Sequence, residues 1–244
     1  MSTPLTASDL AALREFDTPT ICNVIELFNV RPRNTGYMNH HIKAAFPKMP
    51  PMVGFASTAT FRSLALPRKQ GDAYASLSQQ AERFAELPGP AVVVFQDLDN
   101  PCVSATFGEV MCSIYKGFGA KGIITSGAGR DLDQVEAIGF QAFTDGTICS
   151  HGYCHTLQLH IPITVGGVAI EPGDLLHGDR NGVTTIPLDI ASEVPQVSKE
   201  LMDAEQVVLD YVRGASPNPK GLEAARKECA AMMSAINKRV TRKK

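Results

Sequence analysis

Apolar residues follow a helical spacing in some stretches of the chain and a strand-like spacing in others. Apolar residues three or four positions apart predict amphipathic helices, and short alternating or continuous apolar runs predict strands. The predicted helices cover residues 8–16, 18–28, 72–87, 108–115, 132–138, 189–212 and 220–239. The predicted strands cover residues 53–61, 91–95, 123–124 and 141–143, with two hairpins over residues 163–170 and 175–186.

This order of elements predicts a mixed α/β core that is followed by a helical C-terminal arm. We expect a core domain over residues 1–188 and a helical extension over residues 189–244. The extension is polar on one face and apolar on the other, with Val194, Leu201 and Val208 on the apolar face. Such a face has to be covered, either by the chain's own core or by a neighbouring subunit.

Composition narrows the class of protein. The chain has 244 residues, an apolar fraction of 44% and a formal net charge of -2, which are ordinary values for a globular protein. This charge balance gives no reason to expect a nucleic-acid partner, and no apolar run is long enough to span a bilayer. The first residues show no signal-peptide pattern, so we expect a cytoplasmic protein.

The first candidate site combines Glu109 with the adjacent pair Arg130 and Asp131, which begins twenty-one positions later. Each of these segments lies at a predicted turn beside glycines. Arg130 could hold a planar anionic oxygen system, and Asp131 could hold a hard cation. This combination is typical of a site for chemistry next to a carbonyl group. The alternative is a salt-bridged surface turn, which is common for adjacent arginine and aspartate residues.

Two other motifs suggest chemistry at first sight. Gly117 to Gly122 spells GxGxxG, but a predicted helix precedes it and a strand follows, the reverse of a dinucleotide fingerprint. We therefore interpret these glycines as a helix end and a tight turn. No GxSxG elbow and no Walker loop occur, which disfavours hydrolase and nucleotide-transferase functions.

The second motif is a cluster of cysteines and histidines within residues 149–160. The cluster contains Cys149, His151, Cys154, His155 and His160. Its spacing matches none of the usual structural zinc patterns. The open alternatives are that His151 or His155 lines the pocket as a hydrogen-bond donor or proton carrier, and that a histidine of the cluster is buried with satisfied hydrogen bonds.

Several segments taken together resemble a known family. The matching segments are Gly108-Glu109, Gly127-Ala128-Gly129-Arg130-Asp131, Ile138-Gly139-Phe140, Pro162 to Val168, Pro172 to Leu175 and Gly178 to Pro187. Together they resemble the RraA-like family, which includes the 4-hydroxy-4-methyl-2-oxoglutarate (HMG) aldolases. The resemblance runs from about Thr18 to Pro187 and makes residues 1–188 an RraA-like aldolase domain.

The resemblance implies a fold and an assembly. The family fold is an α/β/β/α sandwich of the swivelling-domain type. Members form homotrimers or hexamers of stacked trimers, with active sites at subunit boundaries. We therefore expect the arm from residue 189 onward to pack across a neighbouring protomer, because a sandwich that closes at Ile186 and Pro187 leaves it no evident place. The family's aldolases depend on a divalent metal and release pyruvate from 4-hydroxy-2-oxo acids, and many also decarboxylate oxaloacetate.

The resemblance also implies roles for individual residues. Asp131 matches the metal-binding aspartate, and Arg130 matches the arginine that contacts the keto or enolate oxygen of the substrate. Gly108 and Glu109 lead into the backbone amides of Val110 and Met111, which match those that cradle the pyruvate carboxylate. Glu109 is expected to hold the water that moves protons.

From these observations we expect a carbon–carbon lyase that uses Mg²⁺ or Mn²⁺ and acts on a small 2-oxo acid. Lys121 is the nearest candidate for a Schiff-base mechanism, but it precedes the strand that leads to Arg130, so we discount it. Residues 36–51 and 149–160 do not match the described aldolases and are expected to shape the substrate pocket. The main alternative is a regulator without catalytic activity, because some family members bind and inhibit a ribonuclease. A third hypothesis is a related enzyme, a decarboxylase or dehydratase, that uses the same enolate chemistry.

Overall fold

The fold is known from a computed structural model, which describes residues 5–68 and 74–242. The helices are α1 (Ala7–Leu13), α2 (Thr18–Phe28), α3 (Leu77–Glu82), the 3₁₀ helix η2 (Arg83–Glu86), α4 (Glu109–Gly117), α5 (Leu132–Ala137), α6 (Val194–Arg213) and α7 (Pro219–Val240). The strands are β1 (Lys43–Ala44), β2 (Met52–Arg62), β3 (Ala91–Asp97), β4 (Ala105–Phe107), β5 (Gly122–Thr125), β6 (Ala128–Gly129), β7 (Gln141–Thr144), β8 (Gly146–Thr147), β9 (His155–Leu159), β10 (Ile163–Val165), β11 (Val168–Ile170), β12 (Leu175–Asp179) and β13 (Gly182–Ile186).

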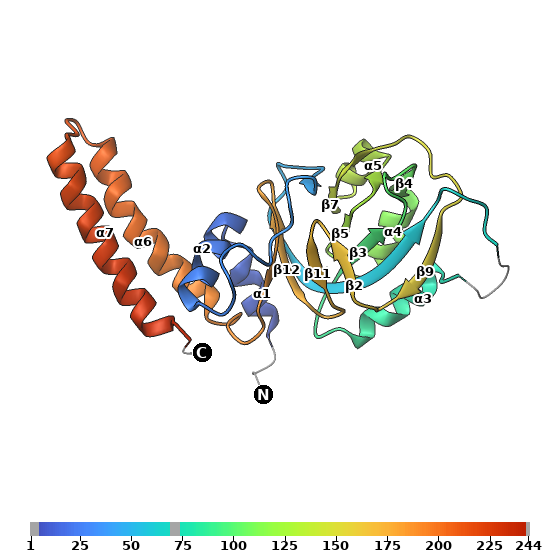
Figure 1. Ribbon diagram of the computed structural model, residues 1–244, viewed down its shortest axis with the longest axis horizontal. Coiled ribbons are helices and arrows are strands. Elements are labelled where there is room, and N and C mark those ends of the chain that lie inside the picture. Colours follow the sequence, from blue (N-terminus) through green and yellow to red (C-terminus); the bar gives the residue numbers. More distant parts are fainter. Residues whose placement is uncertain (1–4, 69–73, 243–244) are drawn as a thin grey trace.

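An eight-stranded mixed sheet forms the centre of the molecule (Figure 1). Its strand order is β1-β7-β5-β3-β2-β12-β13, and β9 also pairs with the long strand β2. Strands β2, β3, β5 and β7 run parallel, so their carboxyl ends lie at one edge of the sheet. The predicted mixed α/β core is therefore confirmed.

The two faces of this sheet are covered by different elements because successive side chains of a strand point to opposite sides. Val93 and Phe95 of β3 pack with Tyr115 of α4 and Val135 of α5 in one buried cluster. Val92 and Val94 of β3 pack with residues of the β10–β11 hairpin in another. Strand β3 is thus buried on both faces, as its continuous apolar sequence predicts.

A second, three-stranded parallel sheet carries the turns that matter for function. Its order is β4-β6-β8, and β6 lies between its two neighbours. Helix α4 begins directly after β4, and α5 begins shortly after β6. This topology brings the two candidate segments of the sequence to the same edge of one small sheet.

The C-terminal arm is a helical hairpin, as predicted. Figure 1 shows α6 and α7 running side by side away from the core. The base of the hairpin is buried on the chain's own N-terminal helices, where Val194, Val197 and Leu201 of α6 pack with residues of α1 and α2. No helix in the described part of the chain is both long and apolar enough to cross a membrane.

Several predicted helix boundaries are wrong. The helix predicted from residue 189 begins only at Val194, and the helix predicted to residue 16 ends at Leu13. The first helix is capped by Thr6 rather than by Ser8 and Asp9, because Asp9 completes a capping box with Thr6. The helix predicted over residues 72–87 begins only at Leu77, because Ser76 caps it. The backbone of Ala75 donates a hydrogen bond to Thr156, and Asp72 lies outside the described residues.

Other predictions of turns and strands have mixed outcomes. The glycines of the GxGxxG sequence end α4 and turn the chain into β5, as predicted, and Gly119 has a positive φ of 91°. Residues 30–51 are irregular apart from the two-residue strand β1, and Met52 already belongs to β2. No local pattern indicated β1, β4, β6 or β8, because strands of two or three residues have no measurable period. Strand β9 falls within the cysteine- and histidine-rich stretch and was also missed.

Candidate active site

The small parallel sheet positions the candidate site. Phe107 at the end of β4 is paired with Gly129 at the end of β6, and the backbone N–H of Arg130 donates to the carbonyl of Phe107 over 3.0 Å. Gly108 and Arg130 therefore follow neighbouring strands at the same end. Gly108, Glu109, Arg130 and Asp131, which are far apart in the sequence, come together here.

Asp131 is the residue that joins the two segments. Its carboxylate oxygen Oδ2 accepts a hydrogen bond of 3.1 Å from the backbone N–H of Glu109. The same oxygen lies 3.7 Å from Nε of Arg130, and both side chains are about one-third exposed, at 34% for Arg130 and 39% for Asp131. Arg130 and Asp131 therefore form the ion pair expected of adjacent residues, and the carboxylate of Asp131 also accepts a hydrogen bond from the start of α4.

Two backbone conformations make this contact possible. Asp131 adopts the left-handed region with φ of 53°, which aspartate tolerates better than most residues. A Cβ atom on Gly108 would lie 2.5 Å from Oδ2 of Asp131 and 3.1 Å from Nε of Arg130. Only glycine at position 108 lets the two strand ends approach this closely.

The first turn of α4 presents backbone donors at this site. The N–H of Cys112 donates to Gly108, and the N–H of Glu109 donates to Asp131. Within residues 5–68 and 74–242, the N–H groups of Val110 and Met111 have no hydrogen-bond acceptor. The side chain of Val110 is 72% exposed, so these donors lie at the surface. Free N–H groups at a helix start can bind an anionic group such as a carboxylate.

Glu109 lies beside these donors with an exposed side chain. Its backbone, rather than its carboxylate, makes the contact with Asp131. The carboxylate has no hydrogen-bond or ion-pair partner among the described residues, so it is available to a water molecule or a ligand. Met111 is partly buried and packs on the cluster around Tyr115 and Phe107, which fixes the start of the helix.

The site can supply one carboxylate to a divalent cation. Asp131 keeps its second oxygen, Oδ1, free of hydrogen bonds to the described residues. The described residues contain no cluster of three or more acidic, histidine or cysteine side chains that could hold a metal without help. A single carboxylate completed by water and substrate oxygens fits Mg²⁺, which rarely uses an all-protein cage.

The cysteine- and histidine-rich stretch does not form a metal site among the described residues. His160 is a largely buried histidine with partners on both ring nitrogens, Oγ of Ser57 at 3.0 Å and a carboxylate oxygen of Glu86 at 3.1 Å. Burial lowers its pKa. The prediction of a buried, hydrogen-bonded histidine therefore holds for His160.

The residue directly before this stretch contacts the candidate site. The N–H of Ile148 donates to the carbonyl of Gly129 over 3.1 Å, directly before Arg130. Burial raises the pKa of the Cys154 thiol, and the nearby positive charge of Arg130 opposes this shift.

Asp97 is a residue that the sequence did not single out. It ends strand β3, and burial raises the pKa of its carboxyl group to about 6. Its Oδ2 atom is buried and has no hydrogen-bond partner among the described residues. A Cβ on Gly127 would lie 2.5 Å from this oxygen and 2.5 Å from Oγ1 of Thr106. Asp97 therefore lies beneath the turn that leads to Arg130. An acidic residue at the carboxyl end of a buried parallel strand was the signal available.

A known protein family matches this chain. The RraA-like family, described as Aldolase/RraA, matches residues 18–185, which is more than half of the chain. The chain belongs to the RraA-like family. The resemblance predicted from the paired Glu109 and Arg130-Asp131 motifs is thereby confirmed.

Relatives within the RraA-like family give a coarse view of function. A protein of Halalkalibacterium halodurans named "Putative 4-hydroxy-4-methyl-2-oxoglutarate aldolase" is 35% identical over 114 residues, which cover 46% of this chain and 53% of the relative. The chain spans about half the length, or less, of the first curated relatives that it matches. Function is therefore supported at the level of an aldolase-type or RraA-like protein.

Solved structures confirm the RraA-like fold. An uncharacterized protein from Pseudomonas syringae pv. tomato superposes with a TM-score of 0.70 at 22% identity, covering 93% of this chain and 96% of that chain. Streptomyces coelicolor RraAS2, an unusual member of the RNase ES inhibitor RraA protein family, superposes with a TM-score of 0.65 at 20% identity. That comparison covers 84% of this chain and 96% of RraAS2. At these identities the likeness establishes the fold alone.

Proposed function

We propose that the protein is a divalent-metal-dependent carbon–carbon lyase that cleaves a 4-hydroxy-2-oxo acid and releases pyruvate. The observation that supports this most directly is the meeting of Asp131, Arg130 and the free N–H groups of α4 at one edge of the small sheet. The names of the curated relatives add support at the level of the family. Mg²⁺ or Mn²⁺ bound by Asp131 would supply a Lewis acid for the keto oxygen.

Different groups of the chain bind different parts of the substrate. The N–H groups of Val110 and Met111 bind the carboxylate of the substrate, because the start of α4 carries a partial positive charge. Arg130 faces the keto oxygen and stabilises the negative charge that develops there in the transition state. Its pairing with Asp131 orients the guanidinium group, and a guanidinium group can donate two parallel hydrogen bonds.

The reaction needs one proton to leave and one to arrive. When the C3–C4 bond breaks, its electron pair forms the enolate and C4 becomes a carbonyl carbon, while the 4-hydroxyl proton leaves. A water held by the free carboxylate of Glu109 accepts this proton and then returns a proton to C3, which gives pyruvate. In oxaloacetate the same bond breaks with loss of carbon dioxide, so the site would also act as a decarboxylase.

A lysine mechanism fits the site less well. Lys121 precedes β5, whereas Arg130 follows the carboxyl end of that strand through Ser126 to Gly129. The two residues therefore lie toward opposite ends of the strand. A covalent adduct between protein and substrate that borohydride traps by reduction would point to a Schiff base and would contradict the proposal.

The assembly and the location belong to the same proposal. We expect a homotrimer or homohexamer in the cytoplasm, with residues 1–188 as the catalytic domain and residues 189–244 as the extension. A second candidate function is regulation of a ribonuclease, because the family that matches this chain is described as Aldolase/RraA and so includes RraA proteins as well as aldolases. The two candidates differ in a simple respect, because only the lyase turns over a small molecule.

One assay tests the proposal. Purified full-length protein is mixed with Mg²⁺ and a panel of 4-hydroxy-2-oxo acids and oxaloacetate, and pyruvate is measured by its NADH-dependent reduction. Activity should disappear in EDTA and return with excess Mg²⁺ or Mn²⁺. Full activity in EDTA would contradict the metal-dependent mechanism. Absence of turnover with every substrate, together with inhibition of a ribonuclease, would favour the regulator instead.

A further inference from the structure

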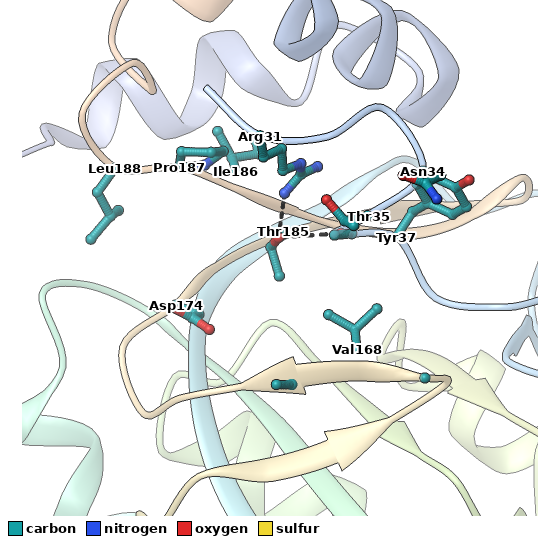
Figure 2. A pocket seen from close by; sticks show the side chains of 13 residues that line it. Arg31, Asn34, Thr35, Tyr37, Val168, Asp174, Thr185, Ile186, Pro187 and Leu188 are labelled. Carbon is teal, nitrogen blue, oxygen red and sulfur yellow. Dashed lines mark hydrogen bonds between the residues drawn. The ribbon is translucent and has the colours of Figure 1, made fainter. Parts of the chain in front are cut away.

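A second cavity lies away from the Arg130–Asp131 site and shares none of its residues. It has a volume of about 420 Å³ and opens between the segment that follows α2, the β10–β11 hairpin and the end of β13 (Figure 2). Its size is within the range of small-molecule sites. Its lining residues are Arg31, Asn34, Thr35, Gly36, Tyr37, Gly167, Val168, Ala169, Asp174, Thr185, Ile186, Pro187 and Leu188.

Arg31 is held rigidly at one side of this cavity. Its Nη1 donates to Oγ1 of Thr185 over 2.7 Å, and its Nη2 donates to Oγ1 of Thr184 over 3.0 Å. Both threonine hydroxyls in turn donate to the carbonyl of Gly36, at 3.0 Å from Thr184 and 3.2 Å from Thr185. A guanidinium group has five N–H donors, so three of them remain available to a ligand.

The positive charge of Arg31 is not balanced by a carboxylate of the described residues. Arg83, Arg130 and Arg242, the other partly buried arginines in residues 5–68 and 74–242, each form an ion pair. Arg31 forms none there, although burial lowers its pKa and so disfavours its charge. A partly buried guanidinium group with free donors and no acidic partner is a ready receptor for an anion.

The backbone beneath the guanidinium group is adapted to this arrangement. Gly36 has a φ of 85°, a left-handed conformation that favours glycine. A Cβ atom there would lie 2.0 Å from Nη1 of Arg31. Any side chain at position 36 would therefore push Arg31 from the position in which the two threonines hold it.

The rest of the cavity limits what the anion can carry. Val168, Ala169, Ile186, Pro187 and Leu188 give the cavity an apolar portion. Asp174 enters from a different segment and stands apart from Arg31 in Figure 2. Its negative charge disfavours a second anionic group on the ligand.

We propose that this cavity binds a small organic monocarboxylate, with its carboxylate on Arg31 and a short apolar body against β11 and the end of β13. The site is separate from the proposed lyase site, and its existence does not depend on lyase activity. Asn34, Thr35 and Tyr37 add polar groups at the rim beside Arg31. The preference for one carboxylate follows because the cavity offers one arginine without an ion-pair partner among the described residues, Arg31, and also contains the negative charge of Asp174.

Butyrate is a suitable probe because it has one carboxylate and a short apolar chain. Its binding to the full-length protein is followed by ligand-observed NMR, with butyramide as the neutral analogue and succinate as the dicarboxylate. Butyrate should bind saturably, butyramide at least about tenfold more weakly, because it lacks the charge, and succinate more weakly than butyrate. Equal binding of butyramide, or tighter binding of succinate, would overturn the proposal.

Variants locate the binding. Arg31→Gln should weaken butyrate binding at least about tenfold, whereas Arg33→Gln, a nearby exposed arginine paired with Glu26, should leave it unchanged. Because Arg31→Gln also removes two internal hydrogen bonds, Ala169→Phe gives an independent test that fills the cavity from an exposed position. Arg130→Gln separates the two sites. Loss of butyrate binding in Arg130→Gln alone, or retention in both Arg31→Gln and Ala169→Phe, would refute the site.

Discussion

The backbone N–H of Glu109 donates a hydrogen bond of 3.1 Å to the carboxylate of Asp131, across a sequence separation of 22 residues. This contact ties the start of α4 to the start of α5. It also means that Asp131 stabilises the fold in addition to any role in metal binding. We therefore expect the loss of this carboxylate to lower the stability of the fold.

Two substitutions of Asp131 should therefore differ. Asp131→Asn keeps a side-chain oxygen for the N–H of Glu109 and tolerates the left-handed backbone, but it loses the negative charge. We expect it to fold normally and to lose nearly all lyase activity and Mg²⁺ binding. Asp131→Ala should also lose about 1 to 2 kcal/mol of stability, because it removes the hydrogen bond that caps α4.

Thermal unfolding, metal titration and turnover measured side by side distinguish these effects. Asp133→Asn, an exposed aspartate in the first turn of α5, is the matched control and should change none of them. If Asp131→Asn kept wild-type turnover and metal affinity, Asp131 would be a structural residue only.

Arg130→Lys tests the chemistry of the guanidinium group. Lysine keeps the positive charge but has no planar fork and no Nε to pair with Asp131. We expect kcat to fall at least about a hundredfold, in line with the loss of one donor to a developing oxyanion. Arg180→Lys, at an exposed arginine outside the site, serves as the control. Near-normal kcat in Arg130→Lys would remove Arg130 from the catalytic role.

The sequence predicted those site residues that carry suitable chemistry and also lie in a recognisable motif. Glu109, Arg130 and Asp131 were found because unusual side chains stand beside glycines at predicted turns, and the structure brings them together. Asp97 was missed, because its proximity to the turn that leads to Arg130 depends on tertiary contacts. Arg31 gave no signal either, since the absence of an acidic partner is visible only after folding.

The elements of the fold likewise divide into those that the sequence predicts and those that depend on tertiary contacts. Long periodic segments such as α2, α6 and the apolar strand β3 were predicted correctly, because local spacing determines which face is buried. The strands β4 and β6 carry the site but have only three and two residues. Their pairing is set by the long strands that precede and follow them, which no local pattern reveals.

The raised pKa of Asp97 predicts a pH dependence of stability. In the folded state this pKa is about 6, compared with 3.8 for an exposed aspartate, so the folded state holds the proton more tightly. Between these pH values the folded state binds more protons than the unfolded state, and stability falls as pH rises through the window. The full pKa shift corresponds to a decrease in the free energy of unfolding on the order of 3 kcal/mol above pH 6.

Asp97→Asn should remove this loss, because the amide stays neutral and its oxygen can still accept from the N–H of Asp99. The variant should be more stable than the wild type at pH 8 and nearly equal to it at pH 4. Urea unfolding at both pH values and one protein concentration measures the difference. Equal stability of variant and wild type at pH 8 would mean that burial does not raise the pKa of Asp97.

The last prediction concerns the arm, for which the structure changes the argument. We expected the arm to pack across a neighbouring protomer because it had no evident place on its own core. Its base does have such a place, since Val194, Val197 and Leu201 are buried at 0 to 1% exposure among residues of α1 and α2. Truncation after Ser192 would remove these core residues, so it cannot distinguish assembly from folding.

The outer half of the hairpin carries the remaining apolar surface, and Leu209 and Val212 are 39% and 42% exposed there. If this surface packs on a neighbouring protomer and helps to close its site, the double substitution Leu209→Glu and Val212→Glu should lower the oligomeric mass in light scattering and reduce turnover together, because two buried charges would oppose the contact. Lys227→Glu, an exposed charged position on α7, should leave both unchanged. A double variant that keeps the full mass and full turnover would show that the outer arm does not join protomers.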